Sequence, residues 1–173
     1  MKTIIISSSL SKTSKSFILC SSVFSKLKSR DIDVELIDSR DIHLLPFHKE
    51  VSPSMNELTK KVKNADNIIF GMGVHCYSIN DSLKIILDAC CEHAVGKFFG
   101  IVCAAGGDRS YLSTQHLTQI CMNEWRMIQL PRIIYATSKD FHESEIQNED
   151  LISRIDQFVN DFILIGHKLK DVR

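Results

Sequence analysis

Short runs of β-branched and aromatic residues alternate along this chain with longer segments whose apolar residues recur at helical spacing. Ile4-Ile5-Ile6 is the first such run, and similar runs follow at residues 34–37, 67–70, 98–103 and 132–136. Strands that alternate with helices form parallel sheets, because each right-handed crossover returns the chain to the same edge of the sheet. The alternation therefore predicts an α/β fold with five parallel strands.

The intervening segments carry apolar stripes with a period near 3.6 residues, as amphipathic helices do. Residues 112–125 give a weaker signal of the same kind, and Ser54 is the expected N-cap of the second helix. The stronger stripes are Phe17, Cys20, Phe24 and Leu27; Met55, Leu58 and Val62; Leu83, Ile86, Leu87 and Cys90; and Leu151, Ile152, Ile155, Phe158, Val159 and Phe162.

Five strands in one doubly wound domain are typical of the strand order 2-1-3-4-5. We predict one such domain over residues 1–173. Apolar residues make up 44% of the chain and charged residues 24%, which are ordinary globular values and exclude a disordered chain or a coiled coil. In this architecture ligands bind beyond the carboxyl ends of the strands, between the first and third strands.

Charge and cysteine usage narrow the functional classes. The chain has 21 basic and 21 acidic residues, so no overall basic field attracts nucleic acid or an anionic membrane. The apolar runs fall far short of the ~20 residues that a spanning helix needs. The six cysteines form no C-x-x-C pair, which indicates reduced thiols and a cytoplasmic protein. The spacings of His75, Cys76, Cys90, Cys91 and His93 match no zinc pattern, so no metal is expected.

The first loop of the predicted sheet is rich in hydroxyl groups. Residues 8–16 hold six serine or threonine side chains and two lysines, immediately before a predicted helix. Backbone N–H groups at a helix start attract anions, and hydroxyls donate to phosphate oxygens. The segment lacks the G-x-x-x-x-G-K pattern of a Walker loop. It is read either as a phosphate site or as a serine-rich loop that only caps the helix.

Small residues follow the third and fourth strands. Gly71 and Gly73 do not complete a dinucleotide fingerprint, because a third glycine is missing and the first strand is the expected place for it. Two glycines here allow close approach of the backbone to a ligand. Residues 104–107 are Ala-Ala-Gly-Gly, which suits a flat ring lying against the backbone. An ordinary tight strand-to-helix turn is the alternative.

Taken together, these loops resemble the NADPH-dependent FMN reductases, a flavodoxin-like family. Its members carry G-S-x-R-x-x-S-x-N after the first strand, T-P-x-Y-N and later G-x-L-K-N with an Asp after the third, and a glycine-rich turn with Arg after the fourth. The matching segments here are Ser9 to Ser16, Ser78 to Lys84 with Asp88, Gly106 to Arg109, and the pre-strand Leu130-Pro131-Arg132. The family's first Gly, Arg and Asn are replaced by Ser8, Ser11 and Ser16, and Pro-x-Tyr-Asn by Gly73-Val74-His75-Cys76.

The resemblance implies an oxidoreductase that uses FMN and takes hydride from NADPH or NADH. The acceptor would be a small molecule: a flavin, quinone, azo compound or metal oxyanion. The alternative is a non-enzymatic electron carrier or flavin-binding module. A homodimer or homotetramer is implied as well. The implied contacts are Ser9, Ser11, Ser14 and Ser16 for the phosphate; Val74, His75 and Cys76 for the isoalloxazine edge; and Gly106, Gly107 and Arg109 for the pyrimidine side.

His75 is the one candidate for a catalytic role. In the family pattern a Tyr stands beside the flavin at this position, and an imidazole leaves more room over the ring. Imidazoles titrate near neutrality, so His75 either acts on the reduced flavin and an anionic acceptor or turns its side chain to solvent and contacts the flavin through its backbone only.

Overall fold

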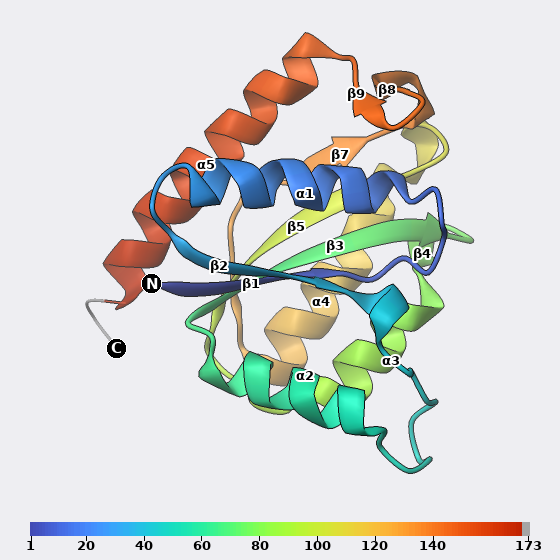
Figure 1. Ribbon diagram of the computed structural model, residues 1–173, viewed down its shortest axis with the longest axis vertical. Helices are drawn as coiled ribbons and strands as arrows, with labels where there is room; N and C mark the ends of the chain where they lie inside the picture. Colours follow the sequence, from blue (N-terminus) through green and yellow to red (C-terminus); the bar gives the residue numbers. More distant parts are fainter. Residues whose placement is uncertain (171–173) are drawn as a thin grey trace.

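The computed structural model describes residues 1–170 and places a parallel sheet between two helical layers (Figure 1). The order β2-β1-β3-β5 is followed by an outer position that two short strands share, since β6 and β7 both pair with β5. This is the predicted order 2-1-3-4-5. The strands of the sheet are β1 (Lys2–Ser7), β2 (Asp33–Asp38), β3 (Asn67–His75), β5 (Phe98–Ala104), β6 (Ile128–Gln129) and β7 (Ile134–Ala136).

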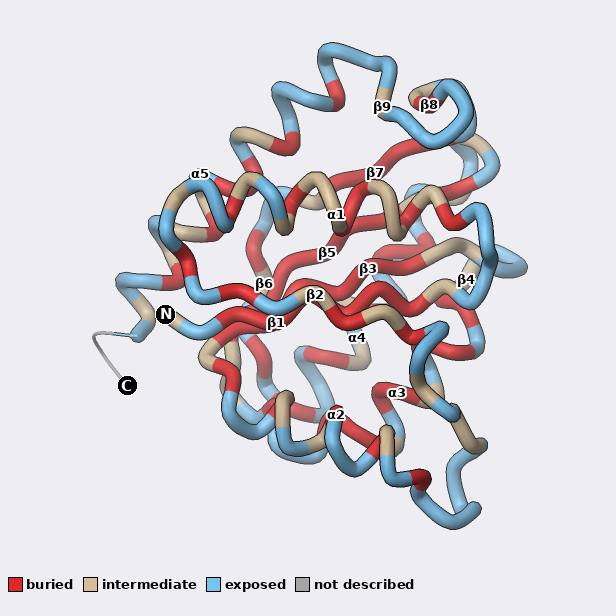
Figure 2. Tube along the Cα trace, viewed as in Figure 1, coloured by how far each residue is buried: buried red, intermediate tan, exposed pale blue. Residues whose placement is uncertain are grey.

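Helices cover both faces of the sheet, so its central strands are buried on each side (Figures 1 and 2). One face packs against α1 and α5, and the other against α2, α3 and α4. The helices are α1 (Lys15–Lys28), α2 (Pro53–Asn64), α3 (Asp81–Cys90), α4 (Thr114–Trp125) and α5 (Glu149–Lys170). Because both faces are covered, the central strands β1, β3 and β5 are nearly continuous buried runs, whereas the edge strand β2 alternates.

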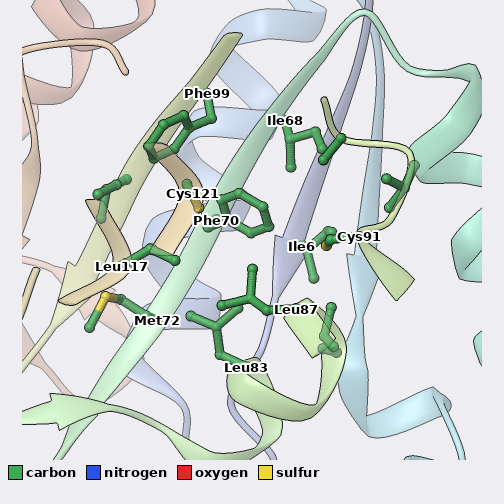
Figure 3. Packing of buried hydrophobic residues seen from close by; sticks show 14 of the residues in the cluster. Ile6, Ile68, Phe70, Met72, Leu83, Leu87, Cys91, Phe99, Leu117 and Cys121 are labelled. Carbon is green, nitrogen blue, oxygen red and sulfur yellow. The ribbon is translucent and has the colours of Figure 1, made fainter. Parts of the chain in front are cut away.

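Aromatic and aliphatic side chains fill the layer under α3 and α4 (Figure 3). The rings of Phe70 and Phe99 meet edge to face on neighbouring strands, with centroids 6.1 Å apart. Leu83 and Leu87 of α3 and Leu117 of α4 are fully buried in the same layer. The apolar stripe predicted for the third helix is therefore confirmed. Its burial holds α3 against the sheet, directly after the loop of β3.

The fifth strand is divided because of a proline. The Leu130 N–H donates to the Phe99 carbonyl at 2.8 Å, but Pro131 has no N–H to continue the ladder. Pairing resumes at Ile134, opposite Val102. The strand predicted over residues 132–136 is therefore shortened to β7, and β6, which precedes Pro131 and was not predicted, pairs with the other end of β5.

Two details of the predicted helices are wrong. The N-cap of α2 is Ser52, whose Oγ accepts from the Met55 N–H at 3.2 Å, because Pro53 occupies the first helical position that suits proline. Ser54 instead accepts from the His43 N–H. In α1 the buried stripe runs along Ser16, Leu19, Cys20, Val23 and Leu27, so Phe17 and Phe24 lie at its margins.

Several short elements were not predicted from the sequence. A hairpin joins the end of β3 to β4 (Ser78–Ile79), and a second hairpin joins β8 (Phe141–His142) to β9 (Glu145–Ile146). Short 3-10 segments form η1 (Ser39–Asp41), η2 (Asp108–Ser113) and η3 (Ser138–Asp140). Such two- to six-residue segments are too short to produce a periodic signal. No helix within residues 1–170 has the length and hydropathy of a transmembrane segment.

Candidate functional site

A cavity of about 230 Å³ lies at the carboxyl edge of the sheet, where β1, β3 and β5 are neighbours. Its lining comes from the loop after β1, the end of β3, the end of β5 and Ser138 of η3. Seven of the ten predicted site residues line it: Ser9, Ser11, Ser14, Ser16, Val74, His75 and Gly106. The fold thus gathers the three loops that the sequence singled out.

The serine loop (residues 8–14) is organised by its own hydroxyl groups. Ser14 is the N-cap of α1, and its Oγ accepts from the Phe17 N–H at 3.0 Å. That Oγ also lies 3.0 Å from the Ser16 Oγ. Ser11 Oγ accepts from the Thr13 N–H at 3.3 Å, and Ser9 Oγ from the Ser11 N–H at 3.3 Å. The hydroxyls therefore both cap the helix and line the cavity, so the two readings of this loop are compatible.

The charge of the cavity favours an anion. Lys15 is a lining residue, and no carboxylate belongs to the lining within the described part of the chain. The Lys15 Nζ lies 5.6 Å from the centroid of the Phe141 ring, so β8 helps to position this ammonium group. A cation, several hydroxyls and a helix start at one place form the donor set that a phosphate requires.

The glycines of these loops are of two kinds. A Cβ at Gly73 or at Gly106 would meet no heavy atom within 4 Å, so both backbones border open space in the cavity. A Cβ at Gly71 would instead collide with the Cys20 Sγ. Gly71 is therefore a packing residue between β3 and α1, contrary to the expectation that both glycines face a ligand. Gly73 and Gly106 leave the room that a planar ring system needs to reach the backbone, so this part of the cavity suits the edge of a flavin ring.

A buried amide network connects the serine loop to the end of β3. Asn80 is 1% exposed; its Oδ1 accepts from the Ser8 Oγ at 3.0 Å and from the Gly73 N–H at 3.1 Å. Its Nδ2 donates to the Ser8 carbonyl at 3.2 Å and to the Ser82 Oγ at 2.7 Å. Sequence reasoning missed this residue. Asn before a predicted helix was a visible N-cap signal, but Asn80 makes no capping hydrogen bond and serves the loops instead.

The glycine turn after β5 is held from the neighbouring strand. The Tyr135 hydroxyl donates to the Gly107 carbonyl at 2.6 Å, and the Ser138 Oγ donates to the Gly106 carbonyl at 3.1 Å. Burial raises the pKa of Tyr135, which favours the protonated hydroxyl that makes this bond. Tyr135 and Ser138 were also missed, because their partners are backbone atoms 28 and 32 residues away.

Three predicted residues lie outside the cavity lining. Cys76 occupies the turn between β3 and β4, where it and Tyr77 have positive φ angles of 48° and 59°, and it does not line the cavity. Arg109 is exposed in η2, and Gly107 is engaged by Tyr135. Their predicted contacts with flavin stay predictions. The His75 side chain is 64% exposed, with Nδ1 3.8 Å from the Asp81 carboxylate.

The cysteines other than Cys76 are buried. Burial raises the pKa of the thiols of Cys20, Cys103 and Cys121 to about 12, which makes them poor nucleophiles and poor metal ligands at neutral pH. Within residues 1–170 no three His, Cys, Asp or Glu side chains are arranged to hold a metal ion.

A family model described as NADPH-dependent FMN reductase matches residues 1–142 of the 173. Among curated proteins, none matches this chain.

Solved structures of the same fold include a NADH:FMN oxidoreductase (EMOB) in its apo form, with a TM-score of 0.81 and 18% identity over 94% of this chain and 88% of that one. The NAD(P)H:(acceptor) oxidoreductase FerB from Paracoccus denitrificans has a TM-score of 0.76 and 16% identity over 97% and 98%. A flavodoxin from the domain Archaea has a TM-score of 0.68 and 16% identity over 98% and 99%. At such identities the likeness shows the fold, which is flavodoxin-like.

Proposed function

Because the chain belongs to the NADPH-dependent FMN reductase family, we propose that the cavity at its switch point holds FMN and that the acceptor is a planar, uncharged molecule such as a quinone or a free flavin. The family makes this protein an FMN-dependent NAD(P)H oxidoreductase. Bound FMN supplies the redox chemistry, by taking a hydride from NAD(P)H and giving up electrons to the acceptor. The protein has to bind the FMN, orient it and shield it from water.

The observation that carries this proposal is the meeting of the serine loop with Gly73 and Gly106 around one cavity. The hydroxyls of Ser9, Ser11 and Thr13 and the ammonium group of Lys15 would hold the phosphate. The open backbone at the two glycines would border the ring system. Asn80 and Tyr135 would act as positioning residues, since each fixes a loop without lining the cavity.

Exposed apolar side chains on the segments that follow β1, β3 and β5 favour an aromatic acceptor. Leu10 follows Ser9 and is 52% exposed, while Tyr77 is 64% and Leu112 is 72% exposed. Tyr111 is also exposed, and its ring packs edge-on against Tyr135 with centroids 5.2 Å apart. Exposed apolar groups of this size near a ligand cavity are typical of sites for apolar partners. A metal oxyanion would gain nothing from them.

We assign His75 to the rim of the site rather than to proton transfer. Its side chain is largely exposed, and the carboxylate near it belongs to the even more exposed Asp81. His75→Phe should therefore leave FMN affinity within about twofold, as exposed substitutions usually do, while changing the KM for the acceptor. An FMN affinity that falls by more than about tenfold would instead place the imidazole on the cofactor.

We also propose a homodimer in which a second copy covers part of the flavin ring. A cavity of about 230 Å³ is smaller than the ~300–1,000 Å³ of typical ligand sites, and the exposed Tyr77 stands beside it. Light scattering at micromolar concentration should give twice the monomer mass. A monomer that binds FMN and turns over at full rate would contradict this part.

The function is tested with the FMN-loaded protein under anaerobic conditions. NADPH or NADH should bleach the oxidised flavin band, and a neutral quinone should restore it faster than chromate does. Failure of both nucleotides to bleach the band would contradict the reductase. Faster recovery with the oxyanion would contradict the proposed acceptor class while leaving the reductase in place.

A further inference from the structure

A second cavity adjoins the serine loop on the outer side of α1. It has a volume of about 550 Å³ and is bounded by α1, by Arg40 of η1 and by the turn of the β8–β9 hairpin. Figure 1 shows this hairpin beside the N-terminal end of α1. Thr13 and Ser14 line both this cavity and the smaller one. A group attached to an anion at these hydroxyls would therefore extend directly into the second cavity.

One wall of the second cavity is a guanidinium group stacked on an aromatic ring. The Arg40 Cζ lies 4.4 Å from the centroid of the Phe17 ring. Asp38 fixes this guanidinium, because its Oδ1 and Oδ2 accept from the Arg40 Nε at 2.9 and 2.8 Å. The result is a planar, preorganised surface of the kind on which heteroaromatic bases stack.

The packing of the fold does not account for this wall. Phe17 belongs to neither of the two apolar clusters around the sheet, although it is on a helix whose other face is fully buried. Lys12 also lines the cavity and forms no ion pair within residues 1–170. Glu143 and Ser144 contribute a carboxylate and a hydroxyl from the hairpin turn.

We propose that this cavity is a subsite for an adenosine phosphate group. The adenine would stack on the Arg40–Phe17 wall, Lys12 would pair with a phosphate, and Glu143 would accept from ribose hydroxyls. The volume lies within the ~300–1,000 Å³ of ligand sites. Two molecules carry this group: FAD, in which it is joined to the flavin phosphate, and the nicotinamide dinucleotide. The inference rests on the proposed flavin site, because Thr13 and Ser14 are shared.

The experiment compares Phe17→Leu with Phe24→Leu. Phe24 is a matched control: it is on the same helix, carries a lysine over its ring at 6.0 Å, and lies outside the second cavity. Affinities for FMN, FAD, AMP and NADP⁺ are measured by calorimetry, the last with FMN bound. Stacking of a base on an aromatic ring contributes to the binding free energy. Phe17→Leu should therefore weaken binding of the adenosine ligand by about tenfold. FMN affinity should stay within about twofold in both variants.

The outcomes distinguish the two molecules that could supply the adenosine group, FAD and the nicotinamide dinucleotide. Weaker FAD binding in Phe17→Leu alone assigns the subsite to the flavin dinucleotide, and weaker NADP⁺ binding assigns it to the nicotinamide dinucleotide. If FMN binds but FAD, AMP and NADP⁺ are all insensitive to Phe17→Leu, or respond equally to Phe24→Leu, the subsite is wrong. If FMN itself does not bind, the flavin site fails. AMP then decides the subsite alone: weaker AMP binding in Phe17→Leu supports it, and the absence of such an effect overturns it.

Discussion

The side-chain amide of Asn80 holds Ser8 from both sides, since its Nδ2 donates to the Ser8 carbonyl at 3.2 Å and its Oδ1 accepts from the Ser8 Oγ at 3.0 Å. The same Oδ1 accepts from the Gly73 N–H. Together with the Ser8 N–H and Oγ, which donate to the Gly71 carbonyl at 3.0 and 2.7 Å, this buried side chain ties the loops of β1 and β3 together. Those two loops border the cavity, so the arrangement of the site depends on a residue that does not line it.

Asn80→Ala should weaken both the fold and FMN binding. It removes the acceptor of the Gly73 N–H, whereas the Ser8 hydroxyl and carbonyl keep Gly71 and Ser82 as partners, so the cost is about 1–3 kcal/mol of unfolding free energy. The loop must then be ordered by the ligand, so FMN affinity should fall by about tenfold. Urea unfolding and fluorescence titration measure the two effects. Asn56→Ala, at an exposed position of α2, is the control and should change neither; equal behaviour of the two variants would contradict the role of Asn80.

Ser14 and Ser52 cap α1 and α2 in the same way, but only Ser14 lines the cavity. Ser52→Ala should cost about 1 kcal/mol or more of unfolding free energy without affecting flavin binding. Ser14→Asp keeps a capping oxygen and adds a negative charge. It should therefore preserve stability while lowering affinity for FMN and sparing riboflavin. Unchanged FMN affinity in Ser14→Asp would place the phosphate elsewhere.

Thiol reactivity should identify Cys76 as the one accessible cysteine. It is exposed, whereas burial raises the pKa of Cys20 and of Cys121 to about 12 and suppresses their thiolates. A disulfide reagent at pH 8 should modify one thiol quickly in the native protein and all six after unfolding. Cys76→Ser should abolish the rapid reaction. Two rapidly reacting thiols in the native protein would contradict the packing described.

Asp140 should contribute to acid sensitivity. Burial acts to raise its pKa, but hydrogen bonds from Thr137 and Asn148 and the charge of Arg154 outweigh burial and hold the pKa below the usual range. Its stabilising effect is therefore present above the unfolded-state pKa of about 3.9 and is lost as pH falls below it.

The loss of unfolding free energy between pH 7 and pH 3 should be smaller in Asp140→Asn than in the unmodified protein. Denaturant unfolding at the two pH values measures it. Equal losses in the two proteins would show that the carboxylate contributes nothing.

The strand order and the place of the site could be predicted from the sequence because both depend on local patterns. Buried strands read as continuous apolar runs, and the carboxyl ends of parallel strands meet at one edge. Serines after β1, glycines near the end of β3 and glycines after β5 therefore had to converge. The roles of individual glycines were not accessible. Gly71 and Gly73 look alike in the sequence, and only the position of Cys20 shows that Gly71 serves packing.

The positioning residues were missed for a related reason. Asn80 reaches Ser8 across 72 residues, and Tyr135 reaches Gly107 across 28. Such long-range pairs leave no periodic pattern in the sequence. Each residue also has an ordinary local explanation: a helix cap for Asn80 and a strand aromatic for Tyr135. Phe17 was assigned to the core stripe because its spacing suits one. The buried face of α1 is rotated by about one residue, which leaves this ring at the second cavity.

The central claim is that the serine loop binds the phosphate of FMN, and the ratio of FMN to riboflavin affinity tests it most directly. The two flavins differ only in that phosphate. Charge-assisted hydrogen bonds contribute about 1.5–3 kcal/mol each, so FMN should bind the unmodified protein at least about tenfold more tightly than riboflavin. Fluorescence titration of both flavins under one set of conditions gives the ratio. Equal affinities would contradict the claim and leave the hydroxyls of the loop as a helix cap alone.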